Sequence, residues 1–267
     1  MFPGKTLQEH VQFVREMARL QLWFLWSWLK RHTQEDFAQG LRKRTDVYHR
    51  TDLCRRTPSG DCDFGDPRWL ELEQAARAVF ERTRRDADGS AFERQAVDIF
   101  GARLDARSAA DYEAGPQLPG YQCGSLKYDP PREDTPDRVF FHIANAVAPR
   151  SIFDEPRYLP ECFAQLMDRS GAEHGVDRLT TATWLNSDER WLRLFPPEWR
   201  ENMGPEMTDV GRGMGWWGQF VNARGTLNHK RAQEFRRTGR LHFPPRRSWC
   251  SFDAMRRRLR GHLRSLP

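Results

Sequence analysis

Two stretches of sequence, RVFFHIAN at residues 138–145 and RLTTATWLNS at residues 178–187, indicate the fold of this chain. Both are rich in β-branched or aromatic residues, which is typical of buried strands. Between them, residues 159–174 carry Phe163, Leu166 and Met167 at helical spacing. Strand, helix and strand in this order predict a βαβ unit.

Polar side chains stand where each predicted strand ends. Asn145 closes the first stretch, with His142 three residues upstream, and Asn186 and Ser187 close the second. Because such units bind ligands at the carboxyl ends of their strands, these residues predict a ligand site. His142 is the candidate catalytic residue, as a proton-transfer group or ligand. The competing interpretation is a buried histidine bonded to backbone, with both asparagines in turns or helix caps.

The whole chain is predicted to have an α/β or α+β fold with a small sheet. Helical patterns over residues 6–30, 67–84 and 90–104 predict a helical N-terminal part, residues 1–114. Residues 115–137 are rich in proline and glycine and predict a connection. Residues 138–267 then form the α/β part, which ends in a basic helix. The alternative is that all three parts make one integrated domain.

Composition favours a folded, soluble protein. Mean hydropathy is −0.81, but seventeen Phe and ten Trp in 267 residues are unlike a disordered chain. Five cysteines without regular spacing predict reduced thiols, and with no secretory signal at residues 1–5 the expected location is the cytoplasm. The apolar stretch Leu20–Leu29 is about half of a membrane span. Its tryptophans predict burial on more than one side, and an oligomer is one way to achieve it.

A second group of candidate residues follows a glycine-rich motif. Gly-Met-Gly-Trp-Trp-Gly at residues 213–218 fits G-x-G-x-x-G, but no strand precedes it with any clarity and no acid stands about twenty residues on. A mobile glycine-rich loop is therefore favoured over a dinucleotide site. Residues 216–237 return to helical spacing, and their substrate-binding candidates are Trp216, Trp217, Gln219, Asn222, Arg224 and His229. A solvated helix face is the alternative.

Neither a metal nor a cofactor is identified by the sequence. No H-E-x-x-H, C-x-x-C or H-x-D pattern occurs, and Asp61, Asp63 and Asp66 near Cys62 favour a solvated acidic loop. Cys123, Cys162 and Ser187 are the nucleophiles considered, and none stands in a recognisable motif.

Charge is unevenly distributed. Residues 222–267 carry a net charge of +11, whereas residues 1–221 carry −5. Residues 252–266 alternate apolar residues with arginines and predict a basic amphipathic helix. Such a helix docks on its own chain or contacts an anionic partner.

Together these features favour an intracellular enzyme that acts on a small polar or anionic metabolite. Its pocket is expected between the strand ends and the glycine-rich loop. The alternative is a protein that binds nucleic acid or another anionic partner through the basic C-terminal helix. The reaction class does not follow from these residues.

Overall fold

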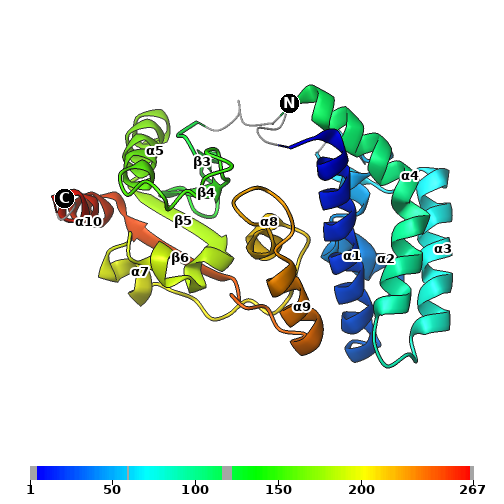
Figure 1. Ribbon diagram of the computed structural model, residues 1–267. Helices are drawn as coiled ribbons and strands as arrows, with labels where there is room; N and C mark the ends of the chain where they lie inside the picture. The colour runs from blue at the N-terminus through cyan, green and yellow to red at the C-terminus, as the bar shows by residue number, and fades with distance from the viewer. Residues whose placement is uncertain (1–4, 59, 116–121, 265–267) are drawn as a thin grey trace. The chain divides into compact units, whose positions relative to one another are not determined.

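The computed structural model describes residues 5–58, 60–115 and 122–264. They form helices and a four-stranded mixed sheet, which confirms the predicted combination of helices with a small sheet (Figure 1). The described chain divides into two compact units. The first contains residues 5–115, 210–213 and 220–241, and the second contains residues 122–209, 214–219 and 242–264.

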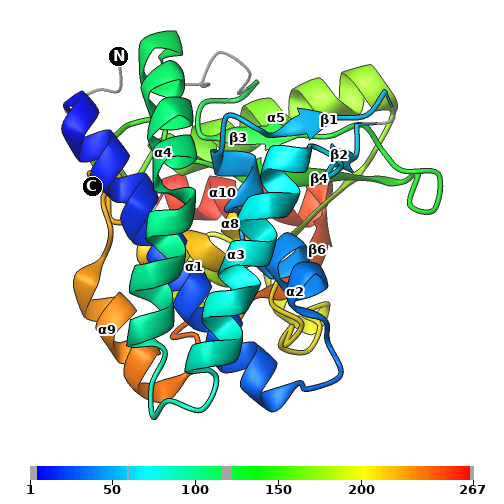
Figure 2. The same ribbon diagram turned by 90° about the vertical axis from the view of Figure 1, so that its right-hand side faces the viewer.

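The first unit is helical. Its elements are α1 (Leu7–Arg31), α2 (Phe37–Arg44), η1 (Tyr48–Arg50), β1 (Arg55–Arg56), β2 (Cys62–Asp63), α3 (Pro67–Thr83), α4 (Ser90–Ala114) and α9 (His229–Thr238). Helix α1 begins with a reciprocal capping box, in which the Glu9 backbone N–H donates to Thr6 Oγ1 and the Thr6 N–H donates to Glu9 Oε2. Helices α1, α3 and α4 lie side by side (Figure 2).

The tryptophan-rich end of α1 is buried inside this unit on two sides. Trp26 donates its indole N–H to the carbonyl oxygen of Thr83, 3.1 Å away, on the side of α3. On the other side, the rings of Trp23 and Phe24 pack against Phe235 of α9 at centroid distances of 5.4 and 5.9 Å. None of the described helices is long and apolar enough to cross a lipid bilayer. The oligomer expected from this stretch stays a prediction.

The second unit holds the main sheet. Its strands are β3 (Leu126–Tyr128), β4 (Arg138–Ile143), β5 (Arg178–Thr183) and β6 (Arg246–Ser251), in the order β3-β4-β5-β6. β4 and β5 are parallel and are joined through α5 (Tyr158–His174), whereas the other two pairs are antiparallel. Short helical elements complete the unit: η3 (Trp184–Ser187), α6 (Glu189–Leu192), α7 (Pro197–Glu201), α8 (Met214–Trp217) and the start of η4 (Gly218–Phe220).

One face of this sheet carries the core of the second unit. Val139, Phe141, Leu179 and Cys250 point to it and are fully buried. Helix α5 and the C-terminal helix α10 (Phe252–Arg264) lie on this side (Figure 1). Phe252, Met255 and Leu259 of α10 are buried in the same core, while its arginines lie on the outer side. Residues 265 and 266, the end of the predicted C-terminal helix, lie outside the described residues.

Several expectations from the sequence require correction. Residues 216–237 are not one helix: they contain the end of α8, η4, a turn around Gly225, which has a φ of +72°, and α9. Residues 246–248, which the sequence places at the approach to the last helix, belong instead to the edge strand β6. The chain also returns to the helical unit at residues 210–213 and 220–241, which the sequence did not indicate. Residues 116–121 of the predicted connection lie outside the described part of the chain.

Candidate functional site

Asn186 organises the interior of the second unit. Its side chain is 1 % exposed, and its Nδ2 donates to the carbonyl oxygens of Thr181 and Arg246 at 3.3 and 2.8 Å. Its Oδ1 accepts the indole N–H groups of Trp191 and Trp199 at 3.1 and 3.2 Å. Because an amide offers two donors and two acceptor lone pairs, all of its hydrogen-bonding capacity is used within the protein.

The other predicted residues at the strand ends also have partners in their own unit. Asn145 closes a turn, since Nδ2 donates to the Arg150 carbonyl oxygen at 2.8 Å and Oδ1 accepts from the Val147 N–H. The Ser187 hydroxyl donates to the carbonyl oxygen of Pro244 at 2.6 Å. His142 lies on the outer face of the sheet, 45 % exposed, with Nε2 2.7 Å from Asp129 Oδ2.

The glycine-rich motif packs helix α8 against the sheet. A Cβ atom at Gly215 would lie 2.9 Å from the carbonyl oxygen of Ala182 in β5, and one at Gly218 would lie 2.7 Å from Nε1 of Trp184. These glycines therefore permit close contact within the protein, which differs from the mobile loop expected from the sequence. Trp216 and Trp217, between them, are buried.

Gln219, also buried, fixes the segment that leads into β6. Its Nε2 donates to the carbonyl oxygens of Trp216 and Phe243 at 3.0 and 3.1 Å, and its Oε1 accepts the Phe243 N–H at 2.9 Å. This side chain holds residues 216 and 243 together.

Three of the predicted binding residues belong to the first unit instead. Asn222 forms hydrogen bonds with the Thr226 hydroxyl and backbone N–H, at 2.7 and 3.1 Å, and so closes the turn before α9. Arg224 is exposed in this turn. His229 is 67 % exposed, with Nε2 4.0 Å from Glu16 Oε1. The predicted residues are thus divided between the two units.

A cluster that the sequence did not indicate lies in the first unit. Nε2 of His49 is 2.8 Å from Sγ of Cys62, and Nδ1 of the same ring is 3.5 Å from Oδ1 of Asp46. The His49 and Asp46 side chains are 13 % and 21 % exposed, and Cys62 is half-buried. A thiol, an imidazole and a carboxylate in this order are the parts of an activated cysteine nucleophile.

Tyr48 brings the hairpin that carries Cys62 against the turn that carries His49. The Tyr48 side chain is buried, and its hydroxyl accepts the Arg55 N–H at 3.0 Å, while its single proton is shared between the carbonyl oxygens of Leu53 and Asp63. Since η1 positions Tyr48 and His49 next to each other, fixing one fixes the other. The cluster therefore rests on packed, hydrogen-bonded backbone.

Burial and nearby charges keep His49 in its neutral form. Burial lowers the pKa of His49, the charge of Asp46 raises it, and Arg212, Arg56 and Arg50 lower it again. The net direction is downward, so the imidazole is neutral at pH 7, as a general base must be.

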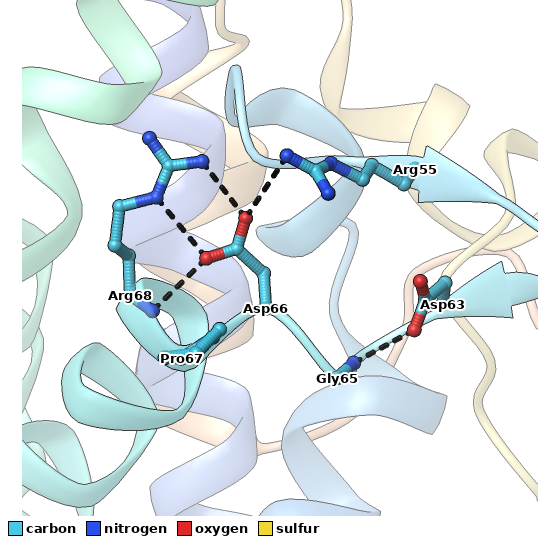
Figure 3. Close-up of a pocket in the computed structure, with 6 residues that line it drawn as sticks. All are labelled: Arg55, Asp63, Gly65, Asp66, Pro67 and Arg68. Carbon is cyan, nitrogen blue, oxygen red and sulfur yellow. Dashed lines mark hydrogen bonds and ion pairs between the residues drawn. The ribbon is translucent and has the colours of Figure 1, made fainter.

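The other face of the hairpin carries a separate, shallow pocket of about 510 Å³ (Figure 3). Asp66 stands at its centre, caps α3 by accepting the Arg68 N–H, and pairs with the guanidinium groups of Arg68 and Arg55 at 2.8 and 3.5 Å. The hydrogen bonds from Arg68 lower the pKa of Asp66 to about 2. This carboxylate is engaged by its arginine partners, whereas the second carboxylate that lines the pocket, Asp63, is exposed and accepts the Gly65 N–H at 2.9 Å.

The described residues form no candidate metal site. Among the described residues, no group of three or more His, Cys, Asp or Glu side chains is arranged to hold a metal ion. The hairpin of β1 and β2 pairs Cys62 with Arg56. Nothing in the spacing of residues 46, 49 and 62 shows that their side chains meet.

Comparison with known proteins gives no family. No protein-family model, no curated protein and no solved structure matches this chain.

Proposed function

We propose that this protein is a thiol-dependent enzyme that acts on a small anionic metabolite at the cluster of Cys62, His49 and Asp46. The observation that carries the proposal is the 2.8 Å separation of Cys62 Sγ and His49 Nε2. A thiol within hydrogen-bond reach of a neutral imidazole can transfer its proton to that ring, which leaves a thiolate, the nucleophilic form of cysteine.

The roles of the three residues follow from their geometry. For Nε2 to accept the thiol proton, the neutral ring must carry its own proton on Nδ1, the nitrogen that faces Asp46 Oδ1. Asp46 is held in turn by Arg50, whose Nε lies 2.7 Å from Oδ2. Among the described residues Nδ1 has no hydrogen-bond partner, so the nearby carboxylate acts on the ring through its charge, which stabilises the imidazolium once it forms.

Acyl transfer is the reaction class that these groups serve. The thiolate attacks the carbonyl carbon of an ester, thioester or amide, the carbon–sulfur bond forms, and the bond to the leaving group breaks. The leaving group takes the proton held on His49 Nε2. His49 then removes a proton from water, whose oxygen attacks the thioester and releases the acid and the Cys62 thiol.

Arginines near the thiol support an anionic substrate. Arg56 pairs with Cys62 across the β1–β2 hairpin, and cross-strand partners project from the same face of a sheet. Arg212 acts on His49 through its charge and is exposed. Guanidinium groups bind carboxylates and phosphates with paired hydrogen bonds, so a carboxylate or phosphate on the substrate has partners here.

The pocket first expected at the carboxyl ends of β4 and β5 has weaker support. Asn145, Asn186, Ser187 and Gln219 are each bonded to their own unit, and His142 is paired with Asp129 on an open surface. A substrate site there, a βαβ unit that serves it, and a cytoplasmic location stay predictions. The thiol cluster replaces His142 as the leading catalytic candidate.

The test is the alkylation of the native protein by iodoacetamide, followed residue by residue with mass spectrometry. Cys62 is expected to react fastest of the five cysteines. His49→Gln is expected to slow its alkylation at pH 7 about 100-fold, within the range that a positioned base contributes. Cys54→Ser is the matched control, since Cys54 is the other half-buried cysteine, and it should leave the Cys62 rate unchanged.

Turnover is measured in parallel with a p-nitrophenyl ester that carries a free carboxylate. A Cys62 acyl adduct in the intact mass, lost in Cys62→Ser, is the expected result. Alkylation of Cys62 no faster than that of Cys54, or the same rate in His49→Gln, would show that the cluster is only structural.

A further inference from the structure

The outer face of the main sheet, opposite the core of the second unit, combines aromatic and cationic side chains. Strand alternation places Phe140 of β4, Thr180 of β5 and Trp249 of β6 on this face, and the register aligns them in one row. Phe140 and Trp249 are both partly exposed, whereas the opposite face of the sheet is covered by the core of the second unit. Two strand spacings separate them by roughly 10 Å.

Cations flank this aromatic row on both sides. Arg138 and Arg178, paired across β4 and β5, place their guanidinium carbons 5.0 and 5.2 Å from the centre of the Trp249 ring. Toward the other end of the strands, Lys127 pairs with His142 across β3 and β4, and Arg247 pairs with Ala182 across β5 and β6. Lys127 and Arg247 are exposed.

Each acid near this face lies beside an arginine or histidine side chain, including Asp177, whose Oδ1 is 3.8 Å from Nε of Arg178. Asp137 lies 2.8 Å from Nε of Arg138 and also pairs with Arg178, while Asp129 pairs with His142. No ion pair within the described chain engages Lys127 or Arg247, and an excess of positive charge therefore lies beside the rings. Asp137 holds the pair of arginines in place, and the pKa of its carboxyl is lowered chiefly by the hydrogen bonds from Arg138.

We propose that this sheet face binds single-stranded nucleic acid. Bases stack on exposed aromatic rings and on guanidinium planes, and the phosphates between them pair with flanking cations. A row of two aromatic residues with cations on both sides supplies both kinds of contact on one surface. This site is independent of the thiol cluster, which lies in the other unit.

The basic helix α10 is the rival surface for the same ligand. Arg256 is 2.8 Å from Asp168, and Arg258 donates to the carbonyl oxygen of Arg193, so these two arginines hold the helix to its unit. Arg257 and Arg260 are exposed. However, the aromatic residue of this helix, Phe252, is buried, so α10 presents charge without a stacking surface.

Binding is measured with the full chain by fluorescence anisotropy, with oligo(U) and oligo(dT) probes of about twelve nucleotides, within the usual site size for such surfaces, at low and at moderate salt. Trp249→Leu is expected to weaken binding about 10-fold through lost stacking. Lys127→Glu and Arg247→Glu are expected to weaken it as well and to reduce the slope of log affinity against log salt by about one each. Both residues are exposed, so these two variants are expected to fold, and circular dichroism verifies it.

The double variant Arg257→Glu/Arg260→Glu is the matched control. It removes the same kind of charge from α10 and should leave the affinity for oligo(U) within about twofold, apart from a small change in salt slope. Loss of binding in this variant with retention in Lys127→Glu and Arg247→Glu would overturn the proposal and assign the contact to α10. Absence of binding by both probes at low salt, or equal binding to vesicles of anionic lipid, would also overturn it.

Discussion

Individual polar residues differ in whether their hydrogen bonds stabilise the fold or serve a reaction. Asn186 stands at the end of β5, where ligand-binding residues are expected, yet its four hydrogen bonds connect β5, β6 and two buried tryptophans. A buried indole N–H without an acceptor costs free energy, so this amide is required by its neighbours. His49 is the opposite case, because its Nε2 meets a thiol rather than backbone.

Asn186→Leu is expected to lower the free energy of unfolding by about 3 kcal/mol, because it leaves the indole N–H groups of Trp191 and Trp199 unpaired in the core. Urea denaturation followed by circular dichroism measures the change. Asn145→Ala is the control, since its turn lies at the surface, and about 0.5 kcal/mol is expected there. Equal losses in the two variants would contradict the structural role of Asn186.

At the scale of elements, the space around each glycine of the 213–218 motif shows whether helix packing requires a glycine there. Helix α8 approaches β5 so closely that only a glycine fits at position 215. Gly213, two residues earlier in the same motif, lies in open space, since a Cβ atom there would have no neighbour within 4 Å. The motif therefore contains two glycines that packing requires, Gly215 and Gly218, and one that it does not, Gly213.

Gly215→Ala is expected to destabilise the protein by about 1–2 kcal/mol, because the new methyl group meets the backbone of Ala182 rather than a side chain that can move. Gly213→Ala is expected to change stability by less than about 0.5 kcal/mol. Thermal unfolding of both variants checks this. Similar melting temperatures for the two would show that α8 shifts without cost.

Over the whole molecule, two separate hydrophobic cores stabilise the fold. Two histidines in the helical unit make its stability depend on pH. Burial is the largest cause of a lowered pKa for both His10 and His49, each in the helical unit. In the unfolded chain these rings take up a proton near a pH of about 6.5. Because the unfolded state binds more protons below that pH, the folded state loses stability as the pH falls.

The free energy of unfolding is therefore expected to decrease from about pH 7.5 to about pH 5.5, as measured by urea denaturation at each pH. His10→Gln should reduce this decrease, because glutamine does not titrate. A decrease of the same size in His10→Gln and the original chain would assign the pH dependence to other groups.

Local patterns in the sequence predicted much of the fold. The helical spacing of residues 6–30, 67–84 and 90–104 and the β-branched or aromatic runs at 138–145 and 178–187 correspond to α1, α3, α4, β4 and β5. These features depend on residues within a few positions of one another, so a single sequence contains them. By contrast, β6 carries no clear strand pattern, because arginine and serine make up most of its residues.

The sequence by itself thus determined which segments form helices and strands, where apolar faces lie, and that the charge gathers near the C-terminus. Only the tertiary structure decided what the polar residues do. Cys62 contacts His49, thirteen residues earlier in the sequence, because the β1–β2 hairpin brings the chain back. Asn186 bonds to β6 and to two tryptophans, all of which are distant in the sequence or come from other elements. Such contacts depend on how distant segments pack, and packing is a property of the assembled chain rather than of local spacing.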